Sequence, residues 1–294
     1  MTASPVGAAA GIEAAGDLTR ALDASAVCTE LLPLAGNLFE ITFQAPELAG
    51  RAEPGEFSQI WVDPRPLPLL RRPFSFSRVR PDRAECSFYL AAVGQGSRRL
   101  RDFRPGDRAR LLGPLGRGFT LPEAPGRSVL LAGGLGAAPF PLLAERLLAR
   151  GEELLWINGA RTAPELYPDH LLPEGLGERW LVTEDGSRGE RGRVSDQLLE
   201  RLAGAQRLYA CGPNPMLAKV AELVAGLEPG TAPVLEVSIE APMGCGFGTC
   251  LGCSIPLARV GSAPAQGLCC RRGPVLRSSE LDWGRLLAQP AHLG

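Results

Sequence analysis

The sequence lacks a surplus of charge of either sign, a long hydrophobic run and an internal repeat. Its 294 residues include 31 Lys and Arg against 32 Asp and Glu, and no Lys- or Arg-rich run stands out. Neither binding to nucleic acid nor attachment to an anionic membrane is therefore indicated. The longest apolar candidate, residues 129–148, is interrupted by glycines, prolines and charged residues, so no membrane span is expected.

The N-terminus, MTASPVGAAAGIEAAG, also lacks the basic start and continuous apolar core of a signal peptide. The cytoplasm is therefore the expected compartment. Residues 1–22, which are rich in Ala and Gly and show no periodicity, are expected to form a flexible arm. The remaining length suffices for two domains and an appendage.

The chain contains eight cysteines. Three of them form a C-x4-C-x2-C run, namely Cys245, Cys250 and Cys253. The adjacent Cys269 and Cys270 follow. This is the plant-type spacing for a [2Fe–2S] cluster, which needs four thiolates and a tight loop. A structural zinc site or a disulfide-rich tail is the alternative, although zinc sites usually combine two symmetric knuckles. Glycines that suit a tight loop occur at Gly244, Gly246, Gly248 and Gly252.

The pattern of apolar residues divides the rest of the chain into two regions and a C-terminal module. Over residues 23–122, short alternating segments separated by Pro and Gly predict an antiparallel β-barrel. Over residues 123–230, buried strands alternate with helices, which predicts a doubly wound parallel sheet. Helices are expected at residues 137–150, 194–202 and 215–227. Residues 231–294 then form a small module that contains the cysteine run.

A basic, aromatic and hydroxyl-bearing segment lies where one barrel strand should begin, and its residues are Arg72, Pro73, Phe74 and Ser75. Such a segment offers a partner for phosphate, a flat surface for an isoalloxazine ring and a hydroxyl near a ring nitrogen. Gly96 and Ser97 follow at a predicted helix start, where free N–H groups attract a pyrophosphate. Together they fit one bound FAD, whereas a strand with one exposed basic end is the alternative for the first segment alone.

A second glycine turn, with Gly133, Gly134 and Gly136, follows a predicted strand and opens a helix. This is where a doubly wound sheet binds the phosphates of a dinucleotide, although the full G-x-G-x-x-G spacing is missing. A tight turn without a ligand is the alternative. Cys211 ends a later strand at the same carboxyl edge, where ligands bind in this architecture; a buried, unreactive cysteine is the competing interpretation.

These motifs occur in the order found in ferredoxin–NADP reductase-like flavoproteins. With the cysteine module last, the chain resembles the electron transfer subunits of bacterial NAD-dependent dihydroorotate dehydrogenases over nearly its whole length after the arm. The resemblance implies an α+β multidomain chain: an antiparallel β-barrel FAD domain, a doubly wound α/β NAD domain and a small C-terminal [2Fe–2S] module. It also implies a separate FMN-containing catalytic subunit, a heterotetramer of two copies of each, and a role in pyrimidine biosynthesis.

The resemblance also assigns site residues. Counting back from Gly273 and Pro274 favours Cys270 over Cys269 as the fourth cluster ligand, which gives C-x4-C-x2-C-x16-C. Arg272 replaces an acidic residue of the family pattern and is expected to raise the cluster potential. Cys211 is expected to lie near the nicotinamide and to position it. The expected FAD contacts are Arg72, Pro73, Phe74, Ser75, Tyr89, Leu90, Ala91, Gly96 and Ser97; the cluster ligands are Cys245, Cys250, Cys253 and Cys270.

The resulting hypothesis is a flavin and iron–sulfur oxidoreductase subunit in which single electrons from a partner's FMN pass through the cluster to FAD and leave as hydride on NAD⁺. Related reductases that serve a sulfhydrogenase or a ferredoxin-dependent transhydrogenase share these motifs. A non-catalytic regulatory subunit that binds zinc is an alternative from another class. Arg161, after the second nucleotide-domain strand, would suit a 2′-phosphate, but the resemblance favours NAD over NADP.

Overall fold

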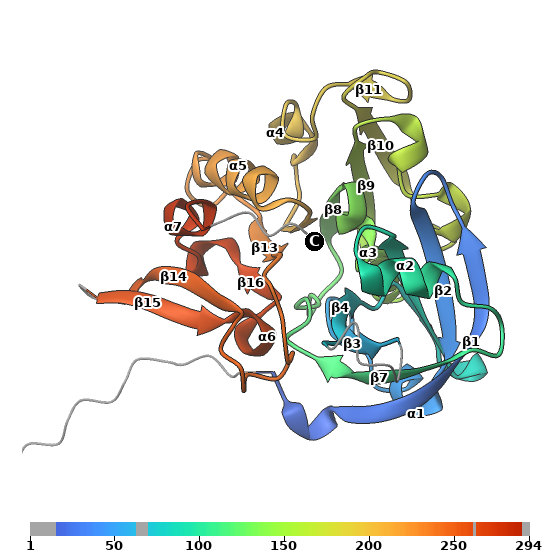
Figure 1. Cartoon of the computed structure of the whole chain (residues 1–294). Coiled ribbons are helices and arrows are strands. Elements are labelled where there is room, and N and C mark those ends of the chain that lie inside the picture. The colour runs from blue at the N-terminus through green and yellow to red at the C-terminus, as the bar shows by residue number, and fades with distance from the viewer. Residues whose placement is uncertain (1–15, 63–69, 261–262, 290–294) are drawn as a thin grey trace, which may run out of the picture.

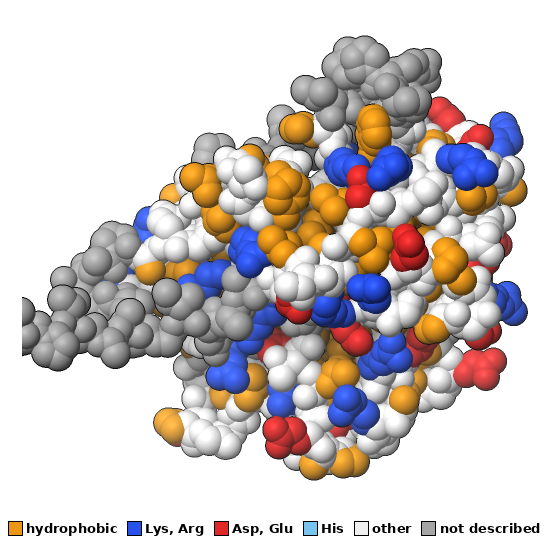
Figure 2. Space-filling model, turned by 90° about the horizontal axis from the view of Figure 1, so that it is seen from below, with side chains coloured by type: hydrophobic (Ala, Val, Ile, Leu, Met, Phe, Trp, Pro, Cys, Tyr) orange, Lys and Arg blue, Asp and Glu red, His pale blue; other side chains and the backbone are white. Residues whose placement is uncertain are grey.

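The computed structural model describes residues 16–62, 70–260 and 263–289, and it contains three connected units (Figure 1). A curled antiparallel sheet is followed by a parallel sheet with helices and then by a small C-terminal module, drawn in orange and red. Among the described residues, no helix is long and apolar enough to cross a membrane. On the face that Figure 2 shows, basic, acidic and apolar side chains of the described residues are all present.

The first unit is a seven-stranded antiparallel sheet in the order β4-β3-β7-β1-β2-β6-β5. The sheet curls until its edge strand β4 lies close to β6, and the predicted barrel is thus confirmed as a curled half-barrel. Side chains of β2 that alternate in sequence point into it, and Phe39, Ile41 and Phe43 are fully buried there. Its strands are β1 (Leu22–Pro33), β2 (Leu38–Gln44), β3 (Phe57–Trp61), β4 (Arg72–Ser75), β5 (Arg78–Arg80), β6 (Glu85–Ala91) and β7 (Arg108–Leu115), with helices η1 (Leu18–Arg20), α1 (Pro46–Ala49), η2 (Pro81–Arg83) and α2 (Gln95–Arg101).

The second unit is built on a sheet in the order β11-β10-β9-β8-β12-β13-β16, parallel except for β16, as the doubly wound pattern predicted. Its central strand β8 buries Val129, Leu130 and Leu131 consecutively, because helices cover both faces of such a sheet. Its strands are β8 (Arg127–Gly133), β9 (Glu153–Ala160), β10 (Glu178–Thr183), β11 (Glu190–Arg191), β12 (Arg207–Cys211) and β13 (Val234–Ser238), with helices η3 (Gly134–Ala137), α3 (Phe140–Leu148), η4 (Ala163–Glu165), η5 (Asp169–Leu171), α4 (Leu198–Arg201) and α5 (Asn214–Ala225).

The third unit contributes a strand to the second sheet. Its β16 pairs antiparallel with β13, and its helix α7 lies against α5. Cys253, Cys269 and Cys270 belong to one hydrophobic core with Phe57 of the barrel and Val237 of the parallel sheet. The elements are β14 (Ser254–Val260), β15 (Ala263–Leu268), α6 (Cys269–Arg272), β16 (Val275–Arg277), η6 (Ser278–Glu280) and α7 (Trp283–Leu287).

Several expectations differ from the structure in detail. The helix expected over 137–150 begins as the short 3₁₀ turn η3, and regular α3 starts only at Phe140, after Pro139. The helix expected over 194–202 is reduced to the four residues of α4. Of the residues 1–22 that were expected to form a flexible arm, residues 1–15 lie outside the described residues. Residues 16–22 are ordered, because the Gly16 N–H donates to the Arg271 carbonyl, η1 spans Leu18–Arg20 and β1 begins at Leu22.

The barrel and the parallel sheet are fixed to each other by hydrogen bonds and ring contacts. The backbone N–H of Leu142 in α3 donates to the Ser77 carbonyl of the barrel over 2.9 Å. The rings of Tyr89 and Tyr167 meet edge to face with centroids 4.8 Å apart. Aromatic pairs in this geometry contribute about 0.5–1.5 kcal/mol beyond the area they bury. The space between the two units is therefore held in a defined shape.

Gly136 provides a test of how the turn after β8 packs. A methyl group at this position would overlap the carbonyl of Cys211 at the end of β12. We expect Gly136→Ala to lower the free energy of unfolding by about 1–3 kcal/mol, because the turn must move away from β12. Gly50→Ala is the matched control, since nothing lies within 4 Å of its added methyl group. Equal stabilities of the two variants in urea unfolding would contradict this packing.

Candidate functional site

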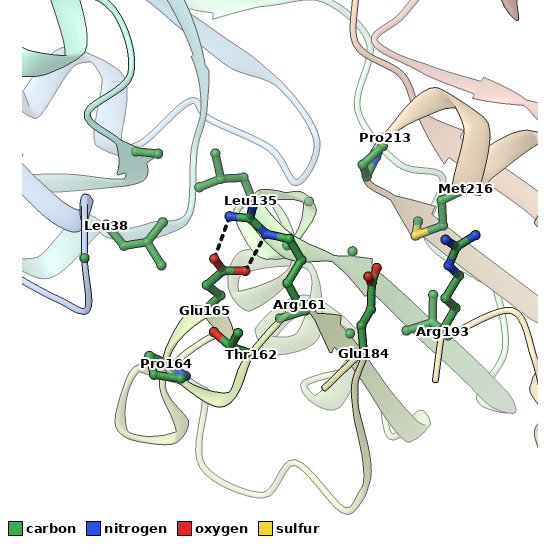
Figure 3. A pocket seen from close by; sticks show the side chains of 18 of the residues that line it. Leu38, Leu135, Arg161, Thr162, Pro164, Glu165, Glu184, Arg193, Pro213 and Met216 are labelled. Carbon is green, nitrogen blue, oxygen red and sulfur yellow. Dashed lines mark hydrogen bonds and ion pairs between the residues drawn. The ribbon is translucent and has the colours of Figure 1, made fainter. Parts of the chain in front are cut away.

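A cavity lies between the barrel and the carboxyl ends of the parallel strands, and its volume is about 830 Å³ (Figure 3). Chain order runs outward from β8 through β9 and β10 on one side, and through β12 and β13 on the other. The strand order thus reverses its direction between β8 and β12. In doubly wound sheets, ligands bind at the point of this reversal, in the crevice beyond the carboxyl ends of the strands. The cavity lies at this position.

The glycine turn after β8 lines this cavity with Gly133, Gly134 and Gly136, as its sequence suggested. Gly134 has φ +54° and open space around its Cα, so the backbone is accessible there. Gly133 and Gly136 are required by packing instead. A methyl group added at Gly133 would overlap Met216, and one added at Gly136 would overlap the Cys211 carbonyl. Only one of the three glycines thus keeps the backbone open toward the cavity.

Charged side chains follow β9 and β10 at the far end of the cavity. Arg161 and Glu165 form a two-pronged ion pair, with Nη2–Oε1 at 2.6 Å and Nε–Oε2 at 3.0 Å (Figure 3). Glu184 and Arg193 line the same cavity, and Arg193 lies on the side of Met216. Arg161 was singled out from the sequence as a candidate nucleotide contact, whereas Glu165, Glu184 and Arg193 were not. The rule that ligands bind beyond the carboxyl ends of parallel strands would have pointed to Glu184, which directly follows β10.

Cys211 ends β12 beside the cavity, and the cavity is lined by the Pro213 and Met216 that follow it. Its side chain is half-buried. Burial raises the pKa of the Cys211 thiol to about 12, a shift that a hydrogen bond with Ser238 partly offsets. Cys211 is therefore a neutral thiol at pH 7, which fits a positioning role and not that of a thiolate nucleophile.

The expected flavin motif is assembled from two elements of the barrel. Arg72 of β4 lies over the start of α2, where a methyl group added at Gly96 would be 3.0 Å from Arg72 Cγ. Ser97 Oγ accepts the N–H groups of Val93 and Gly94 at 3.0 and 3.1 Å. The Ser97 hydroxyl is thus occupied in ordering the start of α2. Pro73, Phe74 and Ser75 continue β4 and are all half-buried.

The three residues expected to contact FAD from β6 lie in different surroundings. Ala91 lines the cavity, Leu90 belongs to the barrel core, and Tyr89 is buried against Tyr167. Burial raises the pKa of Tyr89, so its hydroxyl stays protonated. The side chain of Tyr89 therefore helps to join the two units, that of Leu90 packs inside the barrel, and of the three residues only Ala91 lines the cavity.

The four expected cluster ligands form two pairs. The backbone N–H of Cys250 points at Cys245 Sγ over 3.5 Å, and the Sγ atoms of Cys253 and Cys270 are 3.2 Å apart. Burial opposes the Cys245 thiolate, but N–H groups of the loop outweigh it and lower its pKa to about 7. The Cys270 thiol and its backbone N–H lower the pKa of Cys253 to about 6. The same hydrogen bond between the two thiols raises the pKa of Cys270, so within this pair Cys253 loses its proton first.

This donor set fits a two-iron cluster. Two irons joined by sulfides each need two thiolates, and the cysteines come as two pairs. Among the described side chains, no three of His, Cys, Asp or Glu converge on one point, as the ligands of a single ion would. Cys269 lies in the hydrophobic core, where burial raises its pKa, and no hydrogen bond joins its thiol to another cysteine in the described chain.

Comparisons with known proteins agree with this geometry. Residues 240–282 match the family model of the iron–sulfur cluster binding domain of dihydroorotate dehydrogenase B, and residues 130–222 match that of the oxidoreductase NAD-binding domain. The electron transfer subunit of dihydroorotate dehydrogenase B (NAD(+)) from Geobacillus thermodenitrificans is 36% identical over 84% of this chain and 94% of its own length. The subunit of the same name from Desulforamulus reducens is 32% identical over 90% of this chain and 100% of its own length.

Solved structures share the fold at lower identity. The NADH-dependent reduced ferredoxin-NADP oxidoreductase superimposes with a TM-score of 0.78 at 24% identity, over 90% of this chain and 92% of that one. Phthalate dioxygenase reductase gives 0.59 at 18% identity, over 85% and 95%. The half-barrel, the parallel sheet with its cavity and the cysteine module thus define a reductase of the ferredoxin–NADP reductase class. Within that class, the chain belongs to the family of electron transfer subunits of NAD-dependent dihydroorotate dehydrogenase B.

The pairing of Cys270 with Cys253 leads to a direct test. We expect Cys270→Ser to lose most of the bound iron and acid-labile sulfide, because one of the two thiol pairs is broken. Cys269→Ser is the matched control and should keep both, since its thiol lies in the core. Iron analysis and visible absorption of the purified variants provide the measurement. A full cluster in the Cys270 variant would reverse the assignment.

Proposed function

We propose that this chain is the subunit that transfers electrons from dihydroorotate oxidation to NAD⁺, through a [2Fe–2S] cluster and FAD, in de novo pyrimidine biosynthesis. The observation that carries this proposal is the combination of paired cluster thiols with a cavity at the carboxyl edge of a nucleotide-binding sheet. Family membership connects that combination to dihydroorotate. A cytoplasmic location agrees with eight free cysteines.

Each cofactor has its own set of residues in this proposal. Cys245, Cys250, Cys253 and Cys270 would hold the cluster, and the segments 72–75 and 96–97 would hold FAD. The turn at 133–136 would bind the phosphates of NAD. When bound, the cluster supplies one-electron transfer, and FAD supplies the conversion to the hydride that a nicotinamide accepts.

The side chains around the cavity would orient the nucleotide. The turn after β8 presents the accessible backbone of Gly134, which is suited to phosphate oxygens. Pro213 and Met216 would support the nicotinamide end of the cavity, which Ala91 lines from the barrel. Arg161 and Glu165, beyond β9, would lie at the adenosine end, where the second strand of such a sheet contacts the ribose. No residue of this chain is required to act as an acid or base on dihydroorotate.

A partner subunit would dock over the segment 244–253, which contains Cys245, Cys250 and Cys253 and is called the cluster loop below. Three exposed apolar side chains mark this loop and its edge: Phe247 is 39% exposed, Leu251 65% and Leu70 52%. Leu70 lies 3.9 Å from the position of a methyl group added at Gly244. Cys250 is exposed between Phe247 and Leu251. Exposed apolar groups around a redox centre suit a protein interface, and we assign this surface to an FMN-containing catalytic subunit in a heterotetramer of two copies of each chain.

The decisive experiment is purification of the chain alone and with its catalytic partner. The chain alone should carry flavin, iron and acid-labile sulfide and should oxidise NADH with an artificial acceptor. Dihydroorotate-dependent reduction of NAD⁺ should require both chains. A colourless protein, or dihydroorotate activity that does not depend on this chain, would contradict the proposal.

The docking surface gives a second prediction. We expect Leu251→Asp to weaken formation of the complex by about tenfold or more, because a carboxylate would be buried against an apolar partner surface. Oxidation of NADH by the isolated chain with an artificial acceptor should be unchanged. Leu287→Asp, which alters an exposed leucine of α7, is the matched control. Sedimentation of the mixed subunits measures association, and equal behaviour of the two variants would contradict the surface.

The pairing of Arg161 with Glu165 predicts the choice between NADH and NADPH. Glu165 occupies the guanidinium that would otherwise meet a 2′-phosphate. We expect Glu165→Gln to raise kcat/KM for NADPH relative to NADH by about tenfold, because a charge-assisted hydrogen bond becomes available. The double variant Arg161→Leu/Glu165→Gln should lose this gain. An unchanged ratio in the single variant would contradict the role of the pair.

A further inference from the structure

Gln59 of β3 is a buried polar residue without a partner. Its side chain is fully buried, and neither Nε2 nor Oε1 has a hydrogen-bond partner within the described residues. Leaving such an amide unpaired in a protein interior destabilises the folded state, because its hydrogen bonds to water are lost without replacement. A buried amide in this state is therefore expected to face a group that is not part of the polypeptide.

Gln59 lies against the cluster loop. A methyl group added at Gly246, directly after Cys245, would lie 2.6 Å from Gln59 Cγ and 2.9 Å from its Nε2. The amide thus packs against the cluster loop at the point where the loop turns with φ +83°. Only glycine allows this close approach, because any side chain at position 246 would displace Gln59.

A second unpartnered donor covers the same loop. Arg271 Nη1 is buried without a hydrogen-bond partner in the described chain. A methyl group added at Gly248 would lie 2.9 Å from Arg271 Cγ. Arg272, the next residue, pairs with Glu280 at 3.6 Å, and its expected effect on the cluster potential stays a prediction. The loop is therefore covered at Gly246 by an amide and at Gly248 by a guanidinium.

We propose that Gln59 and Arg271 donate hydrogen bonds to the sulfur atoms of the cluster and thereby raise its reduction potential. Reduction adds negative charge to a cluster, and N–H donors directed at its sulfurs stabilise that charge. Gln59 also pairs with Pro73 across β3 and β4, so it links the cluster loop to the strand that would hold FAD. Both are positioning residues, and the inference rests on the cluster site proposed above.

The test uses the loaded protein. Gln59→Leu keeps the approximate shape of the side chain and removes both polar atoms. We expect the midpoint potential of the cluster, measured by a redox titration followed by electron paramagnetic resonance, to become more negative, and the g-values of the reduced cluster to change. Thr42→Val is the matched control, because it removes the buried hydrogen bond with Ser87 inside the barrel, away from the loop. Gln59→Met repeats the measurement if the Leu variant does not fold.

A second pair of variants separates the hydrogen bond from charge alone. Arg271→Leu and Arg272→Leu each remove one positive charge next to Cys270, but only Arg271 covers the loop. We expect the first variant to shift the midpoint potential further than the second. Equal shifts of the midpoint potential in the two variants would mean that Arg271 acts only through its positive charge. The proposed hydrogen bond from Arg271 would then be overturned.

Each negative outcome has a distinct meaning. A fully loaded Gln59→Leu protein with the potential and spectrum of the unmodified protein would overturn the role of Gln59. A shift in the flavin potential without one in the cluster potential would assign the amide to FAD and would also overturn it. Absence of iron and acid-labile sulfide from the unmodified protein would instead contradict the proposed function.

Discussion

The structure depends on one contact, the packing of the segment 269–275 against both preceding units. The Arg117 N–H, at the exit from the barrel, donates to the Gly273 carbonyl over 2.6 Å, and the Ile239 N–H, after β13, donates to the Pro274 carbonyl over 3.0 Å. Cys269 and Cys270 begin the same segment and lie in the shared hydrophobic core. Cys253 and Cys270, two of the four proposed cluster ligands, are therefore placed by the core that joins the barrel to the parallel sheet, because all three units bury apolar surface in it.

This arrangement explains how the two proposed redox sites can belong to one rigid molecule. The nucleotide cavity opens on the side of the sheet where β8 and β12 end. The cluster loop packs on the outside of the barrel, against Gln59 of β3. Strand β4, with the expected flavin residues, is the direct neighbour of β3. The segment 72–75, which is proposed to hold FAD, is thus separated from the cluster loop by one strand, and Ala91 of the nearby strand β6 lines the cavity.

Much of the fold was readable from local pattern, and the misses share a physical cause. The consecutive buried residues of β8 follow directly from a sheet covered on both faces, and the alternation of Phe39, Ile41 and Phe43 with polar residues in β2 indicates a strand with one face toward a core. The helix expected over 194–202 is shorter because turns around Arg193 and Asp196 replace its first part, with Asp196 Oδ2 accepting the Arg193 N–H. The strand β16 was not foreseen, because a three-residue strand has no periodicity and exists only through its partner β13.

The sequence by itself determined the chemistry: the spacing of the cysteines, the glycine turn after β8 and the Arg72 to Ser75 segment each indicate a ligand through residue type and order. Only the tertiary structure decided which atoms meet. It paired Cys270, and not Cys269, with Cys253, joined Arg161 to Glu165, and brought Gln59 against a loop nearly 190 residues later in the chain. The reason is that spacing limits local backbone geometry, whereas contacts between distant segments arise from burial in a common core.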